Sequence, residues 1–228
     1  MATEVEGRRS GDGRGGQART RLARAAVVQA ARALFLERGY AATTIEAISD
    51  VSDVPPATLY RLFSSKLGIL KALLDISVAG DDLAVAVGDR ADAQALFADP
   101  DPRNQLSGFA GISCGILSRA EPVHRILASA AATDPAAATL LDEYKRQRQE
   151  GQGQIARSLA RAGVLRPGLR ERDAADIIHA LMSPELYRLL VRDRGWPAER
   201  YRRWLEDLLI GQLLPPPATG RRAWKEPT

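Results

Sequence analysis

Residues 43–66 read TTIEAISDVSDVPPATLYRLFSSK, and this stretch decides the fold. Thr43 and Glu46 have the spacing of a capping box, so a second helix is expected to start at Thr43. Proline suits the first turn of a helix, so the prolines at 55 and 56 predict a third helix over about 56–63. Two short helices joined by a tight turn are the minimum needed to place one helix in the major groove of DNA.

The flanking segments also have helical periodicity. A first helix is expected from about Arg19 to Arg38, because apolar residues recur along one face, and Gly39 follows it where a left-handed cap is usual. Ser64-Ser65 predict the start of a fourth helix near Lys66. Residues 1–17 are rich in Gly, Arg and Ser and predict a disordered basic arm.

The rest of the chain predicts further helices and no strands, because no segment alternates apolar and polar residues. Proline or glycine separates the expected helices, which cover about 103–119, 122–132, 135–162, 170–182, 184–194 and 198–213. The predicted fold class is all-α. A three-helix DNA-binding domain over 18–66 precedes a larger helical effector-binding and dimerisation domain over 67–214, and a flexible tail covers 215–228.

Composition limits the function. The 228 residues carry a net charge of +4, and residues 8–32 hold seven arginines against one acid, Asp12, which favours binding to a polyanion such as DNA. No apolar run is long enough for a membrane span, and the first residues do not resemble a secretory signal. The single cysteine, Cys114, excludes an internal disulfide and a cysteine-rich metal site. We therefore expect a cytoplasmic protein with no cofactor, metal or membrane partner.

The residues around the predicted helix-turn-helix closely resemble the DNA-binding domain of the TetR family (TetR/AcrR type) over about 22–75. The resemblance rests on Leu34-Phe35, Gly39-Tyr40, Thr43-Thr44-Ile45, Ile48, Val54, Thr58-Leu59-Tyr60, Phe63 and Ser65-Lys66. The later stretch SPELYRLLVRDRGW, residues 183–196, is similar to actinobacterial-type members of the family.

The resemblance implies specific DNA contacts. The residues matching the family's phosphate contacts are Thr44, Thr58, Tyr60 and Lys66, and those at base-reading positions are Pro56, Ala57 and Arg61. Among these, Arg61 is the expected reader of a guanine, because its fork matches O6 and N7. Arg19 and Arg21 are further candidates in the basic N-terminal region.

The sequence departs from the family pattern in the turn, where Ser52-Asp53-Val54-Pro55 replaces the usual Ala-Gly-Val-Ser. Asp53 is one of the few non-glycine residue types that tolerate a left-handed conformation. Leu62 stands where a histidine or tyrosine often contacts phosphate. These changes affect individual contacts rather than the helix-turn-helix itself.

The second half predicts a dimer interface and an effector site. The expected interface residues are Leu186, Leu189, Leu190, Trp204, Leu205, Leu208 and Leu209. The candidate effector contacts are Phe109, Cys114, Leu117, His124, Tyr144, His179 and Met182, although a residue of each of these types is more often part of the core than a ligand contact. Gly108, Gly111 and Gly115 lie near one helix face, where either close packing or space for a ligand is possible.

The predicted function is a ligand-responsive repressor that binds an inverted-repeat operator on double-stranded DNA as a homodimer and is released by a small-molecule effector. Three alternatives stay open. The first is a TetR-like activator and the second a helical binding protein without DNA binding. The third, an enzyme using Cys114 with His124 or His179, is disfavoured because no surrounding sequence supports a nucleophile.

Overall fold

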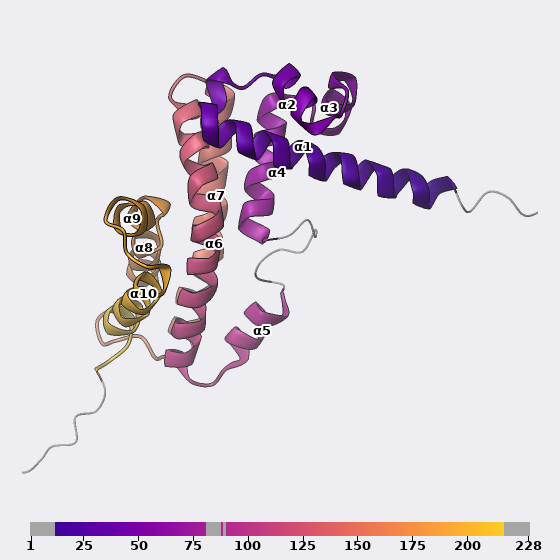
Figure 1. Cartoon of the computed structure of the whole chain (residues 1–228). Helices are drawn as coiled ribbons and strands as arrows, with labels where there is room; N and C mark the ends of the chain where they lie inside the picture. Colours follow the sequence, from indigo (N-terminus) through magenta and orange to yellow (C-terminus); the bar gives the residue numbers. More distant parts are fainter. Residues whose placement is uncertain (1–11, 81–87, 89, 217–228) are drawn as a thin grey trace, which may run out of the picture. The chain divides into compact units, whose positions relative to one another are not determined.

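The computed structural model of the protein describes residues 12–80, 88 and 90–216, and its regular elements there are all helices (Figure 1). The helices are α1 (Asp12–Ala42), α2 (Ile45–Ser52), α3 (Pro56–Phe63), α4 (Lys66–Ala79), α5 (Ala91–Ala98), α6 (Pro102–Ala131), α7 (Pro135–Arg161), α8 (Glu171–Leu181), α9 (Pro184–Tyr187), the π-helix η2 (Arg188–Asp193) and α10 (Ala198–Leu213). The prediction of an all-α fold is confirmed. Within the described residues, no helix has both the length and the apolar character that crossing a membrane requires.

The described chain forms two compact units. The first contains residues up to 77 together with 122–141, and the second contains 78–121 and 142 onward. The first unit is therefore larger than the helix-turn-helix segment expected over 18–66, since it includes most of α4 and parts of α6 and α7. The chain passes from the second unit to the first within α6, at Pro122.

The first helix is longer than expected. We predicted a disordered arm over 1–17 and a helix from about Arg19, but α1 begins at Asp12, so 12–17 are helical. Residues 1–11 lie outside the described part of the chain. The early turns of α1 extend past α2 and α3 (Figure 1). Gly39 breaks the helix with φ 79° and ψ 171°, so its φ is positive as expected, but its ψ lies outside the left-handed helical region of the predicted cap.

The start of α2 lies one residue later than expected. Thr43 is fully buried and its hydroxyl donates to Gly39 O at 2.8 Å, so it cannot cap the helix. Thr44 is the N-cap, and its Oγ1 accepts from Ala47 N at 3.1 Å. The predicted Thr43–Glu46 capping box is therefore wrong. Ser65 is confirmed as the cap of α4, because its Oγ accepts from Gly68 N at 3.0 Å.

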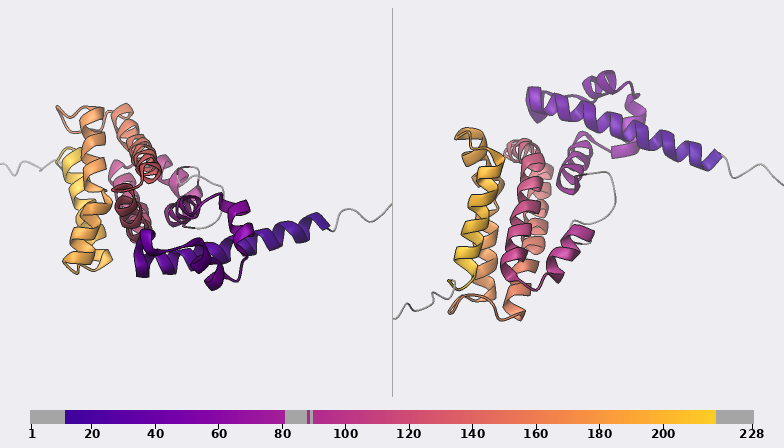
Figure 2. Two further views of the ribbon diagram at one scale, coloured as in Figure 1. Left: turned by 90° about the horizontal axis from the view of Figure 1, so that it is seen from above. Right: turned by 60° about the horizontal axis from the view of Figure 1, so that its bottom comes forward.

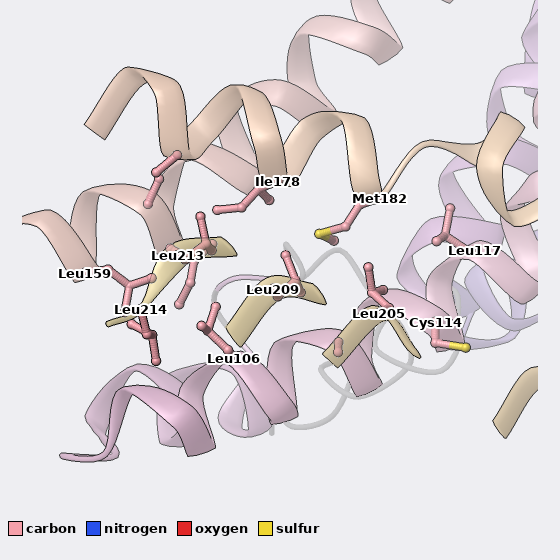
Figure 3. Packing of buried hydrophobic residues seen from close by; sticks show 14 of the residues in the cluster. Leu106, Cys114, Leu117, Leu159, Ile178, Met182, Leu205, Leu209, Leu213 and Leu214 are labelled. Carbon is pink, nitrogen blue, oxygen red and sulfur yellow. The ribbon is translucent and has the colours of Figure 1, made fainter. Parts of the chain in front are cut away.

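The core of the second unit is a cluster of apolar side chains from α6, α7, α8, α9 and α10 (Figure 3). In α10, four residues spaced four apart are fully buried, namely Tyr201, Leu205, Leu209 and Leu213. That spacing is one helix face, so burial of this stripe fixes which side of α10 packs inward. In both views of Figure 2, α8 and α10 run side by side.

Three elements differ from the sequence prediction. A break at Pro122 was expected, yet α6 is continuous through it. An interior proline costs about 3 kcal/mol, but the neighbours Ala120 and Val123 are both buried, and their packing offsets that cost. The short helix α5 was not predicted. The segment 184–194 is helical as expected, but its second half is the π-helix η2.

Candidate functional site

The turn between α2 and α3 is built from side chains that suit its geometry. Asp53 has φ 54° and ψ 34°, so the predicted left-handed residue is confirmed. Its backbone N–H donates to Ser49 O. The buried Ser49 hydroxyl donates to Val54 O at 2.7 Å, which ties the end of α2 to the residue before Pro55. The turn is therefore closed by these two local hydrogen bonds, both of which involve Ser49.

The third helix presents one buried and one exposed face. Leu59 and Phe63 are buried, as their i, i+4 spacing predicted. Tyr60 is 52% exposed, and the other exposed predicted DNA contacts on α3 are Pro56, Ala57 and Arg61. Thr58 is half-buried. A short helix with this exposed face has the form of a recognition helix.

Thr44 lies exposed at the start of α2. Its Oγ1 already accepts from Ala47 N, but a hydroxyl also donates, so its proton is available to a phosphate oxygen. Arg19 and Arg21 are exposed on the early turns of α1, and Arg19 Nε donates to Gly15 O at 3.3 Å. The structure thus places these three residues at the surface of the first unit.

Lys66 differs from the other predicted DNA contacts because its ammonium group is bonded within the protein. Its Nζ donates to Tyr40 O and to Thr43 O, both at 2.8 Å, and lies 4.3 Å from the centroid of the Tyr40 ring. Burial lowers the pKa of the Lys66 ammonium, and Asp134 opposes that shift. Two of its three N–H groups are therefore engaged inside the protein, which makes Lys66 a clamp between α4 and the segment that follows the Gly39 break.

Arg24 makes a structural contact that the sequence did not predict. Its Nη1 donates to Leu62 O at 3.4 Å, and its guanidinium carbon lies 4.7 Å from the Phe63 ring centroid. A cation favours the C-terminal end of a helix, so Arg24 helps hold the end of α3 against α1. Because 38 residues separate Arg24 from Leu62, no local spacing in the sequence signals the contact.

The structure separates the predicted effector contacts into three groups. Cys114, Leu117 and Met182 belong to the apolar core of the second unit, with Phe109 packed against it. His124 is buried in the first unit. Tyr144 and His179 belong instead to a polar cluster on α7 and α8, described below.

The thiol of Cys114 is engaged in the fold. Its Sγ donates to Ala198 O at 3.7 Å, and burial raises the pKa of the thiol. A raised pKa disfavours the thiolate, which is the nucleophilic form. His124, one partner considered for an enzymatic role, belongs to the other compact unit. Among the described residues, no group of His, Cys, Asp and Glu is arranged to hold a metal ion.

The polar cluster links α7 to α8 through His179. Its Nδ1 lies 2.9 Å from Gln152 Oε1, and its Nε2 lies 3.2 Å from Arg148 Nη2. The second guanidinium nitrogen, Arg148 Nη1, donates to Met182 O at 3.2 Å. Arg148 and Gln152 were not singled out from the sequence, because their role depends on the partner that α8 brings to them.

The glycines on one face of α6 differ in how closely other atoms pack against them. A Cβ at Gly108 would lie 2.5 Å from Leu96 Cδ1, so that glycine permits α5 to approach α6 closely. A Cβ at Gly111 would meet no described atom within 4 Å. Close packing therefore explains Gly108 alone.

The predicted dimer-interface residues fall into two groups, one fully buried and one with accessible surface. Leu205 and Leu209 are fully buried within the protomer, so they have no surface to offer a partner, and assigning them to an interface was wrong. Leu189 is 49% exposed. The half-buried remainder of the predicted set is Leu186, Leu190, Trp204 and Leu208. The apolar residues that retain accessible surface are thus found on α9, η2 and one face of α10.

Comparison with known proteins gives one family match. The family model described as "Bacterial regulatory proteins, tetR family" matches residues 27–73, which include α2, α3 and much of α4. The HTH-type transcriptional regulator TcmR of Streptomyces glaucescens is 31% identical over 158 residues, covering 65% of this chain. The match spans 64% of the length of TcmR.

Solved structures share the fold at low sequence identity. A TetR-family transcriptional regulator from Syntrophomonas wolfei aligns with a TM-score of 0.66 and 19% identity, over 82% of this chain and 92% of that one. SmeT of Stenotrophomonas maltophilia, in complex with triclosan, aligns with a TM-score of 0.66 and 18% identity, over 90% and 98% of the two chains. These alignments support the order of an N-terminal helix-turn-helix followed by a helical region.

Proposed function

The chain belongs to the tetR family of bacterial regulatory proteins, and we propose that it is a DNA-binding transcriptional regulator whose recognition helix is α3. The observation that carries this proposal is that α3 follows a turn closed by hydrogen bonds and has one buried and one exposed face. Leu59 and Phe63 fix the helix on its unit, while Tyr60 and Arg61 are left exposed.

We assign roles to the exposed side chains from their chemistry. Arg61 reads a base edge, because a guanidinium fork bonds guanine in two places. Pro56 and Ala57 make only apolar contacts, such as with a thymine methyl. Thr44 and Tyr60 donate hydroxyl protons to phosphate oxygens, which fixes the register of the protein on the duplex.

The remaining phosphate candidates contribute in different ways. Thr58 is half-buried and reaches a phosphate only from the edge of α3. Arg19 and Arg21 add positive charge along the early turns of α1, where contacts with the DNA backbone do not depend on base sequence. Lys66 acts mainly by holding the loop between α1 and α2, with one N–H left for a phosphate.

The regulator acts as a homodimer in this proposal. A recognition helix of eight residues buries little surface, and two-fold dimers on inverted half-sites are the usual solution. The dimer surface we propose consists of Leu186, Leu189, Leu190, Trp204 and Leu208. Trp204 also packs edge-on against Trp196, with ring centroids 5.9 Å apart, so this surface has a rigid aromatic component.

Regulation follows from ligand binding in the second unit. Bound to its operator, the dimer blocks transcription, and a small-molecule effector favours a dimer spacing that no longer fits the half-sites. Such a ligand shifts the equilibrium only by its difference in affinity for the two states.

Selection of bound fragments from the genome that encodes the protein tests the proposal. We expect enrichment of one inverted repeat, with half-sites about 34–36 Å apart or a multiple of that spacing. A reporter driven by the selected promoter should rise when the protein is absent. No enrichment at moderate salt would refute the DNA-binding role, and a reporter that falls instead would replace repression with activation.

A further inference from the structure

Arg148 on α7 is a half-buried cation that donates to two uncharged acceptors, Met182 O and His179 Nε2, each at 3.2 Å. Its Nε is fully buried and has no hydrogen-bond partner. Buried donors in proteins are nearly always paired, and an unpaired one on a charged group is costly. This N–H therefore lacks an acceptor among the residues that the structure describes.

The neighbouring side chains hold the guanidinium in place. Arginine only donates, so His179 Nε2 must accept, and Nδ1 then carries the proton and donates to Gln152 Oε1 at 2.9 Å. Gln152 is 8% exposed, so the end of this chain of hydrogen bonds is anchored in the interior. Burial, together with the charge of Arg148, lowers the pKa of His179, in keeping with a neutral imidazole. The cluster is thus pre-organised around the arginine.

Apolar surface adjoins this cluster directly. Met182 accepts from Arg148 through its backbone oxygen, while its side chain belongs to the apolar core of the second unit. Tyr144, one turn before Arg148 on α7, is also half-buried, and burial raises the pKa of its phenol. The exposed Glu185 is the carboxylate whose charge acts on Arg148, Tyr144 and His179. Because Arg148, Tyr144 and His179 are each only half-buried, the cluster is accessible from the surface of the unit.

We propose that Arg148 anchors a binding site for the carboxylate of a small, otherwise apolar ligand, with His179 and Gln152 orienting the guanidinium. A carboxylate bonds a guanidinium through two parallel N–H groups, and Arg148 has three N–H groups beyond the two already bonded. The apolar part of the ligand packs toward Met182. This inference rests on the proposed function, since it names the chemical class of the effector.

The test uses thermal unfolding of the full chain with octanoate, benzoate and 2-naphthoate, and with their neutral amides. We expect at least one acid, and none of the amides, to raise the melting temperature in a concentration-dependent way. Arg148→Met should weaken acid binding about 10–100-fold, because a charged hydrogen bond is lost. Arg146→Met is the matched control, since Arg146 is exposed on the same helix and pairs with Glu150.

Arg148→Met also separates a binding role from a structural one without any ligand. Without a ligand the Nε of Arg148 stays buried and unpaired, which offsets the two hydrogen bonds that the side chain makes to uncharged acceptors, so methionine should leave the melting temperature unchanged or raise it. A marked fall would mean that Arg148 acts only as a cap of α8. If the methionine variant does not fold, Arg148→Gln keeps a donor for Met182 O without the charge and takes its place in both measurements.

Operator binding by the same samples distinguishes this inference from the proposed function. Wild type and Arg148→Met should bind the selected operator equally in the absence of acid. If wild type binds its operator while no acid shifts the melting temperature, or acids and amides act alike, the carboxylate site is refuted. If acids bind through Arg148 but no DNA is bound, the carboxylate site stands and the DNA-binding function fails.

Discussion

Lys66 in the first unit and Arg148 in the second are both half-buried cations that donate to backbone carbonyls, yet they differ in how fully they are satisfied. The Lys66 Nζ makes two 2.8 Å hydrogen bonds and lies over the Tyr40 ring. Arg148 makes two longer contacts to uncharged acceptors and leaves its Nε without a partner. Two short hydrogen bonds inside the fold indicate a structural role for Lys66, whereas a buried N–H without a partner is the basis for the ligand proposed at Arg148.

The same contrast applies to the two units as wholes. The chemistry assigned to the first unit lies on exposed side chains of α2 and α3, carried by a scaffold whose polar groups bond one another. In the second unit, most of the polarizable candidates are packed into the apolar core, and Arg148, whose Nε lacks a hydrogen-bond partner, lies beside Met182 of that core. The proposed DNA contacts on α2 and α3 are therefore mostly exposed already, while the proposed ligand would supply the hydrogen-bond partner that Arg148 Nε lacks.

The largest expected effect sharpens the distinction between core and surface leucines. Leu205→Ala should destabilise the protein by about 2–5 kcal/mol, because it leaves a cavity in the core of the second unit. Urea unfolding measures this change. Leu189→Asp, at a position that is 49% exposed, should keep the native far-UV spectrum while shifting the sedimentation of the dimer toward the monomer. A monomeric, fully stable Leu205→Ala variant would reverse the two assignments.

The next effect compares the two cations directly. Lys66→Met should destabilise the first unit by about 1–3 kcal/mol, because it removes two charged hydrogen bonds to buried carbonyls. Arg148→Met should cost little or nothing. Parallel urea unfolding of both variants provides the measurement. Equal losses of stability in the two variants would show that Lys66 and Arg148 play the same structural role, which would contradict the comparison.

A smaller effect concerns the unusual turn. Asp53→Gly should stabilise the protein by less than about 1 kcal/mol, because glycine adopts φ 54° without the steric cost of a side chain, partly offset by its greater freedom when unfolded. Asp53→Ala should destabilise it instead, since alanine tolerates the left-handed conformation less well than aspartate does. A stabilising alanine would mean that the left-handed residue is not strained.

The smallest effect is a pH dependence set by His179. Its pKa is lowered in the folded protein, so the unfolded chain binds more protons and stability falls as pH drops below the ordinary histidine pKa of about 6.5. The charged groups acting on the ring are Arg148, Asp176 and Glu185. Unfolding at pH 7 and pH 5 should show this loss, and His179→Gln should reduce it. An unchanged pH profile in the variant would assign the dependence to other groups.

The sequence predicted α2, α3 and α4 well because their signals are local. Two prolines set the start of α3, and Asp53 supplied the left-handed turn. The errors there are small and have local causes, as when Thr43 bonds Gly39 O and leaves the cap to Thr44. The contacts of Arg24 and Lys66 join residues 38 and 23–26 positions apart, so spacing could not reveal them.

The second unit was predicted less completely because helix periodicity shows which residues are apolar but not what covers them. Leu205 and Leu209 read equally well as interface or core, and only the packing of α10 decides between them. The roles of Arg148 and Gln152 depend on α8 placing His179 beside α7, a contact that spans 27–31 positions. Helix α5 is only eight residues long, and its N-cap, Arg90, makes no side-chain capping bond, so no start signal marks it.

The central claim, that α3 reads DNA, is tested most directly by the affinity of Arg61→Ala for the selected operator and for a scrambled duplex of equal length. Wild type should prefer the operator, and the variant should lose about 1–3 kcal/mol of binding on the operator while changing little on the scrambled duplex. Lys71→Ala, which removes an exposed charge on α4, should keep the preference. Equal binding of both duplexes by wild type, or an unaltered preference in Arg61→Ala, would contradict the claim.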